Sequence, residues 1–509
     1  MASELLAQYF WYLFAAVFLA GTLLLSRTKF QRTFIIFLIR TARGSRLLER
    51  LGGLSPQGWL FLGDLATIIS FGGLGAAYVA RHRSVTKFLL ILGVLAIILL
   101  LPLLRSSLPG GPMVWGTAAA ALLLLLLVGL FLQKTAPAAW KGKAAFVLGS
   151  LILFGAMLGF AGAVRPGPSA WAIAGVTGLF GLPGLLVGAL ASQAANILTQ
   201  ESALPGVTPL LPGINPAGDI GFIFPGLDIF IPLWSGLLAL IILLASHEFC
   251  HGILAKIQGI PVKSMGVLTF GILPIGAFVE PDEKALQKKR SEEKMRVYAM
   301  GSFANLMIAI LAILLLGVVS LQAGGMVFPA GVEIAGVQEG FPAATVLEKG
   351  MVITALNGVP VATSEEYLNQ SALVRPGENV TLQTGRDNRT LTAATHPQNS
   401  SRAYLGVTLQ TRLELKPELE GQRGFFSLLL GLGSLLNIIF FLNLNVAIVN
   451  LLPVAPFDGS KMFEELLKSF RLRPELRRQV TRVVVVLVLL LILLNALPLG
   501  RIALGAFGS

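Results

Sequence analysis

Two histidines and a glutamate stand at the end of a long apolar run, in the stretch ASHEFCHGILAK at residues 245–256. His247, Glu248 and His251 form the pattern H-E-x-x-H. On a helix, positions i and i+4 lie on one face, one turn apart, so both imidazoles can bind one metal ion. Glu248 can then approach the remaining coordination position and act as a base toward a metal-bound water. The spacing therefore predicts a zinc site that activates water for attack on a carbonyl group.

The alternative interpretation of this motif is a pair of buried structural histidines that bond to backbone groups. Polar groups inside an apolar span are costly and tend to be functional. The chain has only four histidines, so a chance match to H-E-x-x-H is a poor explanation. We therefore favour the metal site, and we expect His82 and His396, which lie in polar loops, to be solvated.

Two imidazoles leave a zinc ion one protein ligand short, so a third ligand must come from elsewhere in the chain. Asp458 lies in NLLPVAPFDGSK, residues 450–461, where two prolines end an apolar run and free backbone groups that protein must cover. It is a candidate ligand, with an interfacial helix cap as the alternative. Asp64, inside another apolar run, is the second acid that could supply this ligand, although we expect it to be an interfacial or helix-packing residue. Cys250, the single cysteine, is expected to be a small packing residue and excludes an intrachain disulfide.

The composition indicates where these residues must be placed. The chain has 509 residues, of which 55% are hydrophobic and only 13% charged. Uncharged runs of about 18 residues or more recur, which is the length that crosses the hydrocarbon core of a bilayer. We predict a polytopic α-helical membrane protein with about ten spans and no internal repeat. The expected spans are residues 9–25, 58–80, 87–104, 113–133, 145–163, 170–197, 229–257, 295–322, 425–450 and 480–499.

The net charge of +13 does not indicate a nucleic-acid-binding protein, because the basic residues cluster in short loops between apolar runs. Clusters at residues 27–50, 284–296 and 461–482 are typical of cytoplasmic loops under the positive-inside rule. The cluster at 284–296 could also contact anionic lipid. No nucleic acid is expected as a partner.

Loop charge also predicts the topology. With residues 26–57 inside, alternation of the spans gives each later loop a side: 198–228 and 323–424 outside, 258–294 and 451–479 inside. Two small basic loops, 81–87 and 133–143, then fall on the outside, against the rule. Either these loops are exceptions or one of the first six spans is miscounted.

Residues 323–424 differ from the rest because apolar and polar residues alternate, as in MVITALNGVPV at 351–361, which predicts a small strand-rich domain outside the membrane. The expected division follows from this insert: an N-terminal bundle of about six spans at 1–200, an extracytoplasmic Pro/Gly-rich loop at 201–228, the two halves of a core at 229–324 and 413–509, and the insert at 325–412.

Two separate motifs together resemble the site-2 protease family of intramembrane zinc metalloproteases: H-E-F-C-H at 247–251 and N-x-x-P-x-x-P-x-D-G at 450–459. GILPIGAFVEPDE at 271–283 is similar to the family's membrane-inserted β-hairpin, and GSFAN at 301–305 is similar to its G-x-x-x-N/S/G motif. The resemblance covers about residues 229–499.

The insert resembles a PDZ domain of small α/β type. GVQEGFPAATVLEKGMVITALNGVPV at 336–361 follows the bacterial pattern, and YLGV at 404–407 is similar to the loop that binds a peptide carboxylate, displaced to the end as in circularly permuted versions. The first 228 residues match no family that we can name.

The resemblance implies that His247, His251 and Asp458 bind one Zn²⁺ per chain and that Glu248 is the general base. It also implies a set of substrate-binding residues: Asn450 beside the metal, Gly271 and Gly276 in the hairpin, and Tyr404, Leu405, Gly406 and Val407 in the PDZ-like domain. The hairpin could offer an open edge to an unwound substrate segment.

The predicted protein is an intramembrane endopeptidase of a prokaryotic cell membrane that cleaves transmembrane helices of substrate proteins in regulated proteolysis. Its PDZ-like domain is expected outside the membrane, where it binds a C-terminal peptide. One alternative is a non-catalytic PDZ-bearing scaffold with a structural metal, against which the presence of Glu248 argues. Another is a transporter, against which the lack of paired half-helices in two repeats argues.

Overall fold

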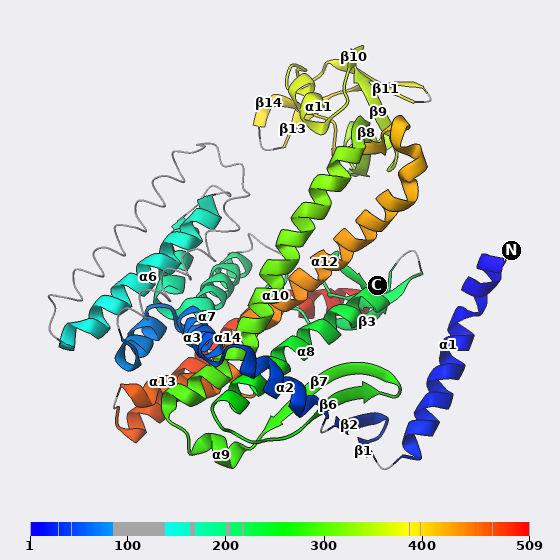
Figure 1. Cartoon of the computed structure of the whole chain (residues 1–509). Coiled ribbons are helices and arrows are strands. Elements are labelled where there is room, and N and C mark those ends of the chain that lie inside the picture. The colour runs from blue at the N-terminus through cyan, green and yellow to red at the C-terminus, as the bar shows by residue number, and fades with distance from the viewer. Residues whose placement is uncertain are drawn as a thin grey trace. The chain divides into compact units, whose positions relative to one another are not determined.

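The computed structural model describes the chain except for residues 1, 29, 42, 85–137, 163–167, 200–203, 216–217, 386, 398, 471 and 508–509. The predicted spans at 87–104 and 113–133 lie outside the described residues. The chain divides into two compact units, one made of residues 1–314 and 435–509 and the other of residues 315–434. Figure 1 labels the elements.

Six described helices are long and apolar enough to cross a membrane. They are α3 (Pro56–His82), α7 (Pro168–Leu198), α8 (Leu233–Ile257), α10 (Ser291–Met326), α12 (Arg423–Val449, preceded by the 3-10 turn Pro417–Gln422) and α14 (Pro474–Phe507). The other apolar helices are α1 (Ala2–Ser26) and α6 (Ala138–Gly162). The molecule is thus a helical membrane protein, as the composition predicts.

Helix α3 is broken in its middle and folds back on itself. Gly72 has φ 55° and ψ −131°, a conformation that favours glycine. The carboxylate of Asp64 accepts from Arg83 Nε at 2.5 Å, although a straight helix would separate two residues nineteen positions apart by about 28 Å. The two halves of α3 therefore form a helical hairpin.

Helix α7 has the same construction. It is broken at Gly181, with φ 68° and ψ −148°, and a Cβ at Gly188 would lie 3.3–3.5 Å from atoms of Ile173, fifteen residues earlier. Only a chain that folds back brings those two positions into contact.

The two breaks have similar sequences and meet each other. FGGLG at 71–75 corresponds to FGLPG at 180–184, and a Cβ built at Gly72 would lie 2.6 Å from Gly178 O and Gly181 N. Helices α3, α6 and α7 pack together as one group (Figure 1). Both helices thus break at a short glycine-containing stretch, which the apolar sequence does not distinguish from an unbroken span.

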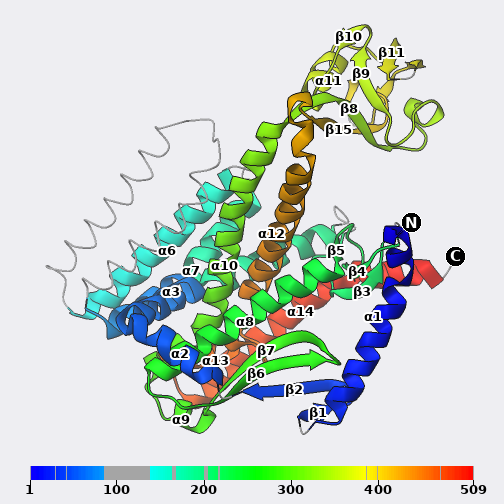
Figure 2. The same ribbon diagram turned by 45° about the vertical axis from the view of Figure 1, so that its right-hand side comes forward.

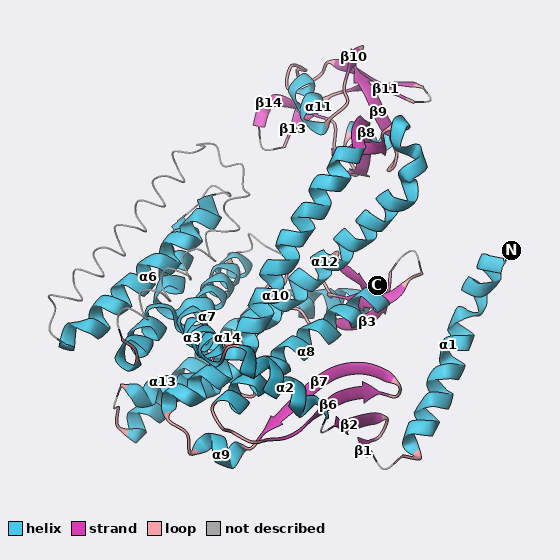
Figure 3. Cartoon of the chain, viewed as in Figure 1, coloured by secondary structure: helices cyan, strands magenta, loops and turns pink. Residues whose placement is uncertain are grey.

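An antiparallel sheet of four strands lies against α8. Its order is β1-β2-β6-β7, with β1 at Gln31–Thr33, β2 at Ile36–Thr41, β6 at Val262–Phe270 and β7 at Leu273–Pro281. Figures 2 and 3 show β2 beside β6 and β7 at the other edge. A hairpin is present, but it spans residues 262–281, so the predicted stretch 271–283 holds only its turn and its second strand. The segment at 26–57, which we expected to be a basic loop, supplies two further strands and helix α2 (Arg43–Leu54).

The segment before α8 also contains strands. The Pro/Gly-rich stretch forms a small sheet in the order β3-β4-β5, made of Leu211–Ile214, Ile220–Ile223 and Phe230–Pro232. Helix α8 begins directly after β5, so this sheet fixes the start of the helix that carries the histidine motif.

The second unit is rich in strands, as its alternating sequence predicts. One sheet has the order β12-β11-β9-β8-β15, with β10 on β9, and β13 pairs with β14. The elements are β8 (Val327–Val337), the 3-10 turn Pro342–Thr345, β9 (Val352–Leu356), β10 (Val359–Pro360), α11 (Ser364–Ser371), β11 (Asn379–Thr384), β12 (Asn388–Thr392), β13 (Ala394–His396), β14 (Asn399–Tyr404) and β15 (Val407–Leu415). Its core contains Val332, Ile334, Ile353, Val380 and Leu382.

Candidate metal centre

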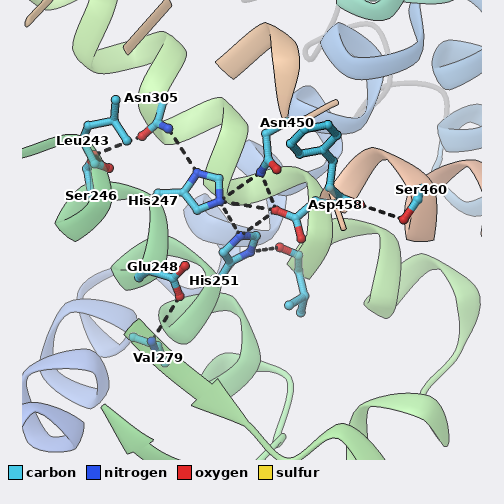
Figure 4. A network of polar contacts seen from close by, with 12 residues as sticks. Leu243, Ser246, His247, Glu248, His251, Val279, Asn305, Asn450, Asp458 and Ser460 are labelled. Carbon is cyan, nitrogen blue, oxygen red and sulfur yellow. Dashed lines mark hydrogen bonds and ion pairs between the residues drawn. The ribbon is translucent and has the colours of Figure 1, made fainter. Parts of the chain in front are cut away.

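Three potential ligands from two distant segments converge in the first unit. Helix α8 presents His247 and His251 one turn apart, and Asp458 is the first residue of α13 (Asp458–Ser469). The Nε2 atoms of the two histidines lie 3.1 Å apart, and Asp458 Oδ2 lies 3.1 Å from His251 Nε2 and 3.3 Å from His247 Nε2. Figure 4 shows the three side chains pointing toward one another.

The donor set fits a zinc ion. Ligands of a tetrahedral zinc with bonds of about 2.0–2.1 Å lie about 3.3 Å from one another, close to the separations in this triangle. Two imidazole nitrogens and a carboxylate oxygen that face one another without a cation leave lone pairs opposed. These three residues could therefore hold a metal, and within the described residues they form a compact candidate group.

Helix α10 supports both imidazoles from the side away from the triangle. His251 Nδ1 donates to the backbone oxygen of Val297 at 2.6 Å, which leaves Nε2 free to bind a metal. The side-chain amide of Asn305 lies 3.1 Å from His247 Nδ1, and Ser246 Oγ donates to the same amide at 3.3 Å. Both ring orientations thus depend on α10.

Gly301 leaves the space that the imidazoles occupy. A Cβ at Gly301 would collide with the Nε2 atoms of both His247 and His251. Together with Asn305 it accounts for the motif GSFAN: the glycine lets α10 approach the ring nitrogens, and the asparagine bonds to one ring from four residues later. The sequence motif was recognised, but the roles of its residues were not.

The segment between α12 and α13 is held in a closed loop that presents Asp458. Asn450 Nδ2 donates to Asp458 Oδ2 at 2.8 Å and lies 3.2 Å from His247 Nε2. Gly459 N donates to Asn450 O at 2.9 Å, and a side chain at Gly459 would collide with the carbonyl of Leu451. Asn450 thus lies at the metal centre, where it also orients the aspartate.

Glu248 points away from the three ligands, toward the β-hairpin. Its Oε2 accepts from the backbone N–H of Val279 in β7 at 3.1 Å (Figure 4). The N–H of Val279 therefore faces away from β6, at the outer edge of the sheet. The predicted base and an edge strand are in direct contact.

The remaining predicted residues lie elsewhere. Asp64 is bonded to Arg83 and Arg296 and is not among the ligands, and Cys250 packs against the hydrophobic core. Gly271 is at the hairpin turn with φ 56°, where a Cβ would collide with α1, so it is not at an open edge. Gly276 lies in β7, opposite Leu268.

The four residues of YLGV border a cavity in the second unit. Tyr404, Leu405, Gly406 and Val407 line a space of about 450 Å³ together with residues of α11 and β15. Gly406 has φ 81°, and its carbonyl accepts from Gln338 N at 2.8 Å.

Sequence reasoning missed Val297 and Ser246. The contribution of Val297 is a backbone carbonyl, so its residue type carries no signal. Ser246 precedes the histidine motif, but a serine in a helix has many ordinary roles.

Comparisons with known proteins agree with the motifs. The model of Peptidase family M50 matches residues 235–494. An uncharacterized protein of Methanocaldococcus jannaschii is 31% identical over 251 residues, which are 48% of this chain and 60% of that protein. A protein of Clostridium perfringens with the printed name "Putative zinc metalloprotease" is 25% identical over 297 residues, 46% of this chain and 86% of that protein.

The matches cover only part of this chain and part of its relatives. This chain spans only 60% of the length of the first relative, and the family model matches the second half of this chain. The family match confirms the resemblance that the two motifs indicated, over nearly the same residues. The chain belongs to peptidase family M50, the site-2 protease family.

Proposed function

We propose that this protein is a zinc-dependent intramembrane endopeptidase that cleaves transmembrane helices of substrate proteins. The observation that carries the proposal is the triangle of His247, His251 and Asp458, with Glu248 next to the first histidine on an apolar helix. Membership of family M50 supports it. A purely structural metal would have no use for Glu248, which argues against a non-catalytic scaffold.

Each residue of the site has its own role in the proposed reaction. A bound zinc ion supplies a Lewis acid and a water whose pKa is lowered to about 7. Glu248 would serve as the general base toward such a water and as the proton donor to the leaving amine. Asn450, with its amide at the metal centre, orients the substrate backbone or the developing oxyanion.

Glu248 must leave Val279 before it can act. A substrate segment that unwinds in the membrane needs partners for its backbone groups, because an unsatisfied group in lipid costs several kcal/mol. The outer edge of β7 offers such partners by strand addition. A substrate strand that takes over the N–H of Val279 would release Glu248 toward the metal, so that substrate binding and base activation occur together.

Substitution of Ala277 by proline tests the edge of β7. Antiparallel alternation places the N–H of Ala277 at the same edge as that of Val279, and proline removes this donor. We expect Ala277→Pro to lower kcat/KM about tenfold, in line with the loss of one hydrogen bond to the substrate, while zinc content stays at the wild-type level. The measurement is cleavage of a transmembrane peptide, with zinc determined on the same samples.

Ala277→Val, which keeps the N–H, is the matched control. If Ala277→Pro cleaves at the wild-type rate, then β7 is not the strand that binds the substrate.

We propose a peptide-binding role for the second unit, which we interpret as a PDZ-like domain. The cavity beside YLGV is lined by Leu409 of β15 and Leu368 of α11, and Arg402 adds a positive charge. A strand edge next to a helix, with a cation nearby, suits an extended peptide that ends in a carboxylate. The ligand would be the C-terminus of a substrate that another protease has already trimmed.

Such a domain could recruit substrates or exclude intact ones. Removal of residues 326–411 separates the two roles. Faster cleavage of full-length substrates favours a size filter, and a general loss of cleavage favours recruitment.

The structure contains the paired broken helices that a transporter would need and that the sequence had not revealed. Their geometry nonetheless argues against a transporter. The breaks of α3 and α7 are so close that even a Cβ at Gly72 would collide with α7, so the two breaks leave no room for a substrate at this point. Asp64, a buried acid of the kind that transporters use, is engaged by two arginines.

Replacement of Glu248 by glutamine tests the proposed function. We expect Glu248→Gln to keep one zinc per chain, because Glu248 is not in the ligand triangle, and to lower cleavage of a transmembrane peptide by about 10²- to 10⁴-fold, the range for loss of a general base. Zinc analysis and peptide cleavage are measured on the same reconstituted preparations. A wild-type chain that binds zinc but cleaves no transmembrane peptide, or a variant with full activity, would show that the proposal is wrong.

A further inference from the structure

Buried charges join α3 to the protease core. Asp64 is 4% exposed and Arg296 of α10 is 5% exposed. One carboxylate oxygen of Asp64 accepts from Arg296 Nε at 2.7 Å, and the other accepts from Arg83 Nε, after the second half of α3. Charges within apolar helices are costly, and they are kept where they serve a function.

A second buried group joins the same helix to α13. Tyr78 of α3 donates to Ser291 Oγ at 2.9 Å, and Ser291 donates to Glu465 Oε2 at 2.8 Å. Glu465 is 4% exposed, and its other oxygen accepts from Lys294 Nζ at 2.6 Å. Burial alone would raise the pKa of Glu465, but the bonds from Lys294, Ser291 and Lys468 hold it below its usual value. Glu465 is therefore ionised and bonded at neutral pH.

Both sets of buried charges, around Asp64 and around Glu465, include residues close in sequence to residues of the metal centre. Arg296 immediately precedes Val297, whose carbonyl orients His251. Glu465 lies seven residues after Asp458, two turns along the same face of α13. The fold-back of α3 is what brings Asp64 and Tyr78, fourteen residues apart, onto a short stretch of α10 (Ser291 to Arg296).

We propose that α3 is a positioning element of the metal centre: Asp64 and Tyr78 hold α10 and α13 at the spacing at which His251 and Asp458 bind one ion. This inference rests on the metal-binding role proposed for those two residues. It gives a function to a helix that lies outside the part of the chain matched by the family model. Asp64 and Tyr78 act through other residues and touch neither metal nor substrate.

Substitutions in the full-length protein test the proposal by its metal, without reference to cleavage. We expect Asp64→Asn to raise the Kd for zinc about 10- to 100-fold, the range found when the outer partners of metal ligands are lost. Tyr78→Phe removes one neutral hydroxyl and should raise the Kd less, by a few-fold. In both variants the absorption bands of bound Co²⁺ should shift, because the angle between His251 and Asp458 changes.

The control is Thr67→Val. Thr67 is buried in α3, and among the described residues its hydroxyl bonds to Gly63 O in the same helix, so zinc affinity and the Co²⁺ spectrum should stay unchanged. Asp64→Asn removes the negative charge that two arginines share, so this variant could fail to fold. In that case Tyr78→Phe still tests the proposal.

The thermal stability of the metal-free protein reports losses of packing, whereas the zinc affinity reports the positioning of the ligands. The two measurements together separate a positioning role from a packing role. Wild-type zinc affinity in Tyr78→Phe, together with wild-type affinity in any folded Asp64→Asn protein, would overturn the inference even if both variants were less stable. A wild-type chain that binds no zinc is a different result, because it overturns the proposed function itself.

Discussion

Asp458→Asn is expected to abolish zinc binding and, with it, peptide cleavage. The substitution keeps the size of the side chain but replaces an anionic ligand by a neutral amide, so one corner of the ligand triangle is lost. The fall in zinc affinity should exceed the roughly 10- to 100-fold typical of residues that only support a ligand. Zinc content after dialysis and cleavage of a transmembrane peptide measure the two effects.

The control for this substitution is Glu464→Gln in the same helix. Glu464 is largely exposed and bonds to Lys468 at 2.8 Å on the surface, so zinc content and activity should not change. Full zinc occupancy in Asp458→Asn would remove Asp458 from the ligand set and contradict the proposed centre.

Gly301→Ala is expected to have the second largest effect. The added methyl group would collide with both ring nitrogens that face the metal, so either the rings turn away or α10 moves outward. Overpacking of this kind costs about 1–3 kcal/mol of stability. We expect zinc affinity to fall at least about tenfold, because the ring orientations set by Val297 and Asn305 are lost. Competition with a chromophoric chelator measures the affinity.

Gly324→Ala in the same helix provides the comparison. A Cβ at Gly324 meets no atom of the described residues within 4 Å, and alanine favours a helix by about 1 kcal/mol over glycine. This variant should bind zinc normally and be no less stable than the wild type. Normal zinc affinity in Gly301→Ala would mean that α10 does not set the approach of the rings.

The candidate ligands could be predicted because their chemistry is local in sequence. His247 and His251 are related by a helical turn, and Asp458 stands at a proline-rich break in an apolar run. The approach of the first residue of α13 to the histidines of α8 then follows from the chemistry, since only residues that converge can bind one ion. The choice between Asp458 and Asp64 was left open by the residues alone, and the structure decides it by distance.

Other parts of the site had no such signal. His251 is held by the backbone carbonyl of Val297, and the pairing of β2 with β6 joins segments more than 200 residues apart. The breaks at Gly72 and Gly181 were missed for another reason. Hydropathy is the same whether an apolar segment runs straight through a bilayer or turns back inside it.

That ambiguity determines how many times the chain crosses the membrane. A helical hairpin that enters and leaves through one face contributes no crossing, so α3 would leave residues 81–83 on the side of residues 26–57. If α7 likewise does not cross while α6 does, the start of α6 comes to this same side. Loops after α7 keep the sides that loop charge predicts, because the count loses two crossings, one at α3 and one at α7.

Contacts in the first unit agree with this count. Arg81 donates to Ser469 O at 3.2 Å, His82 pairs with Glu292 at 3.1 Å, and Gly142 and Lys143 border a pocket with Arg81 and Phe470. The described parts of the two basic loops that broke the charge rule, residues 81–84 and 138–143, would then obey it, on the same face of the bilayer as the basic clusters at 284–296 and 461–482.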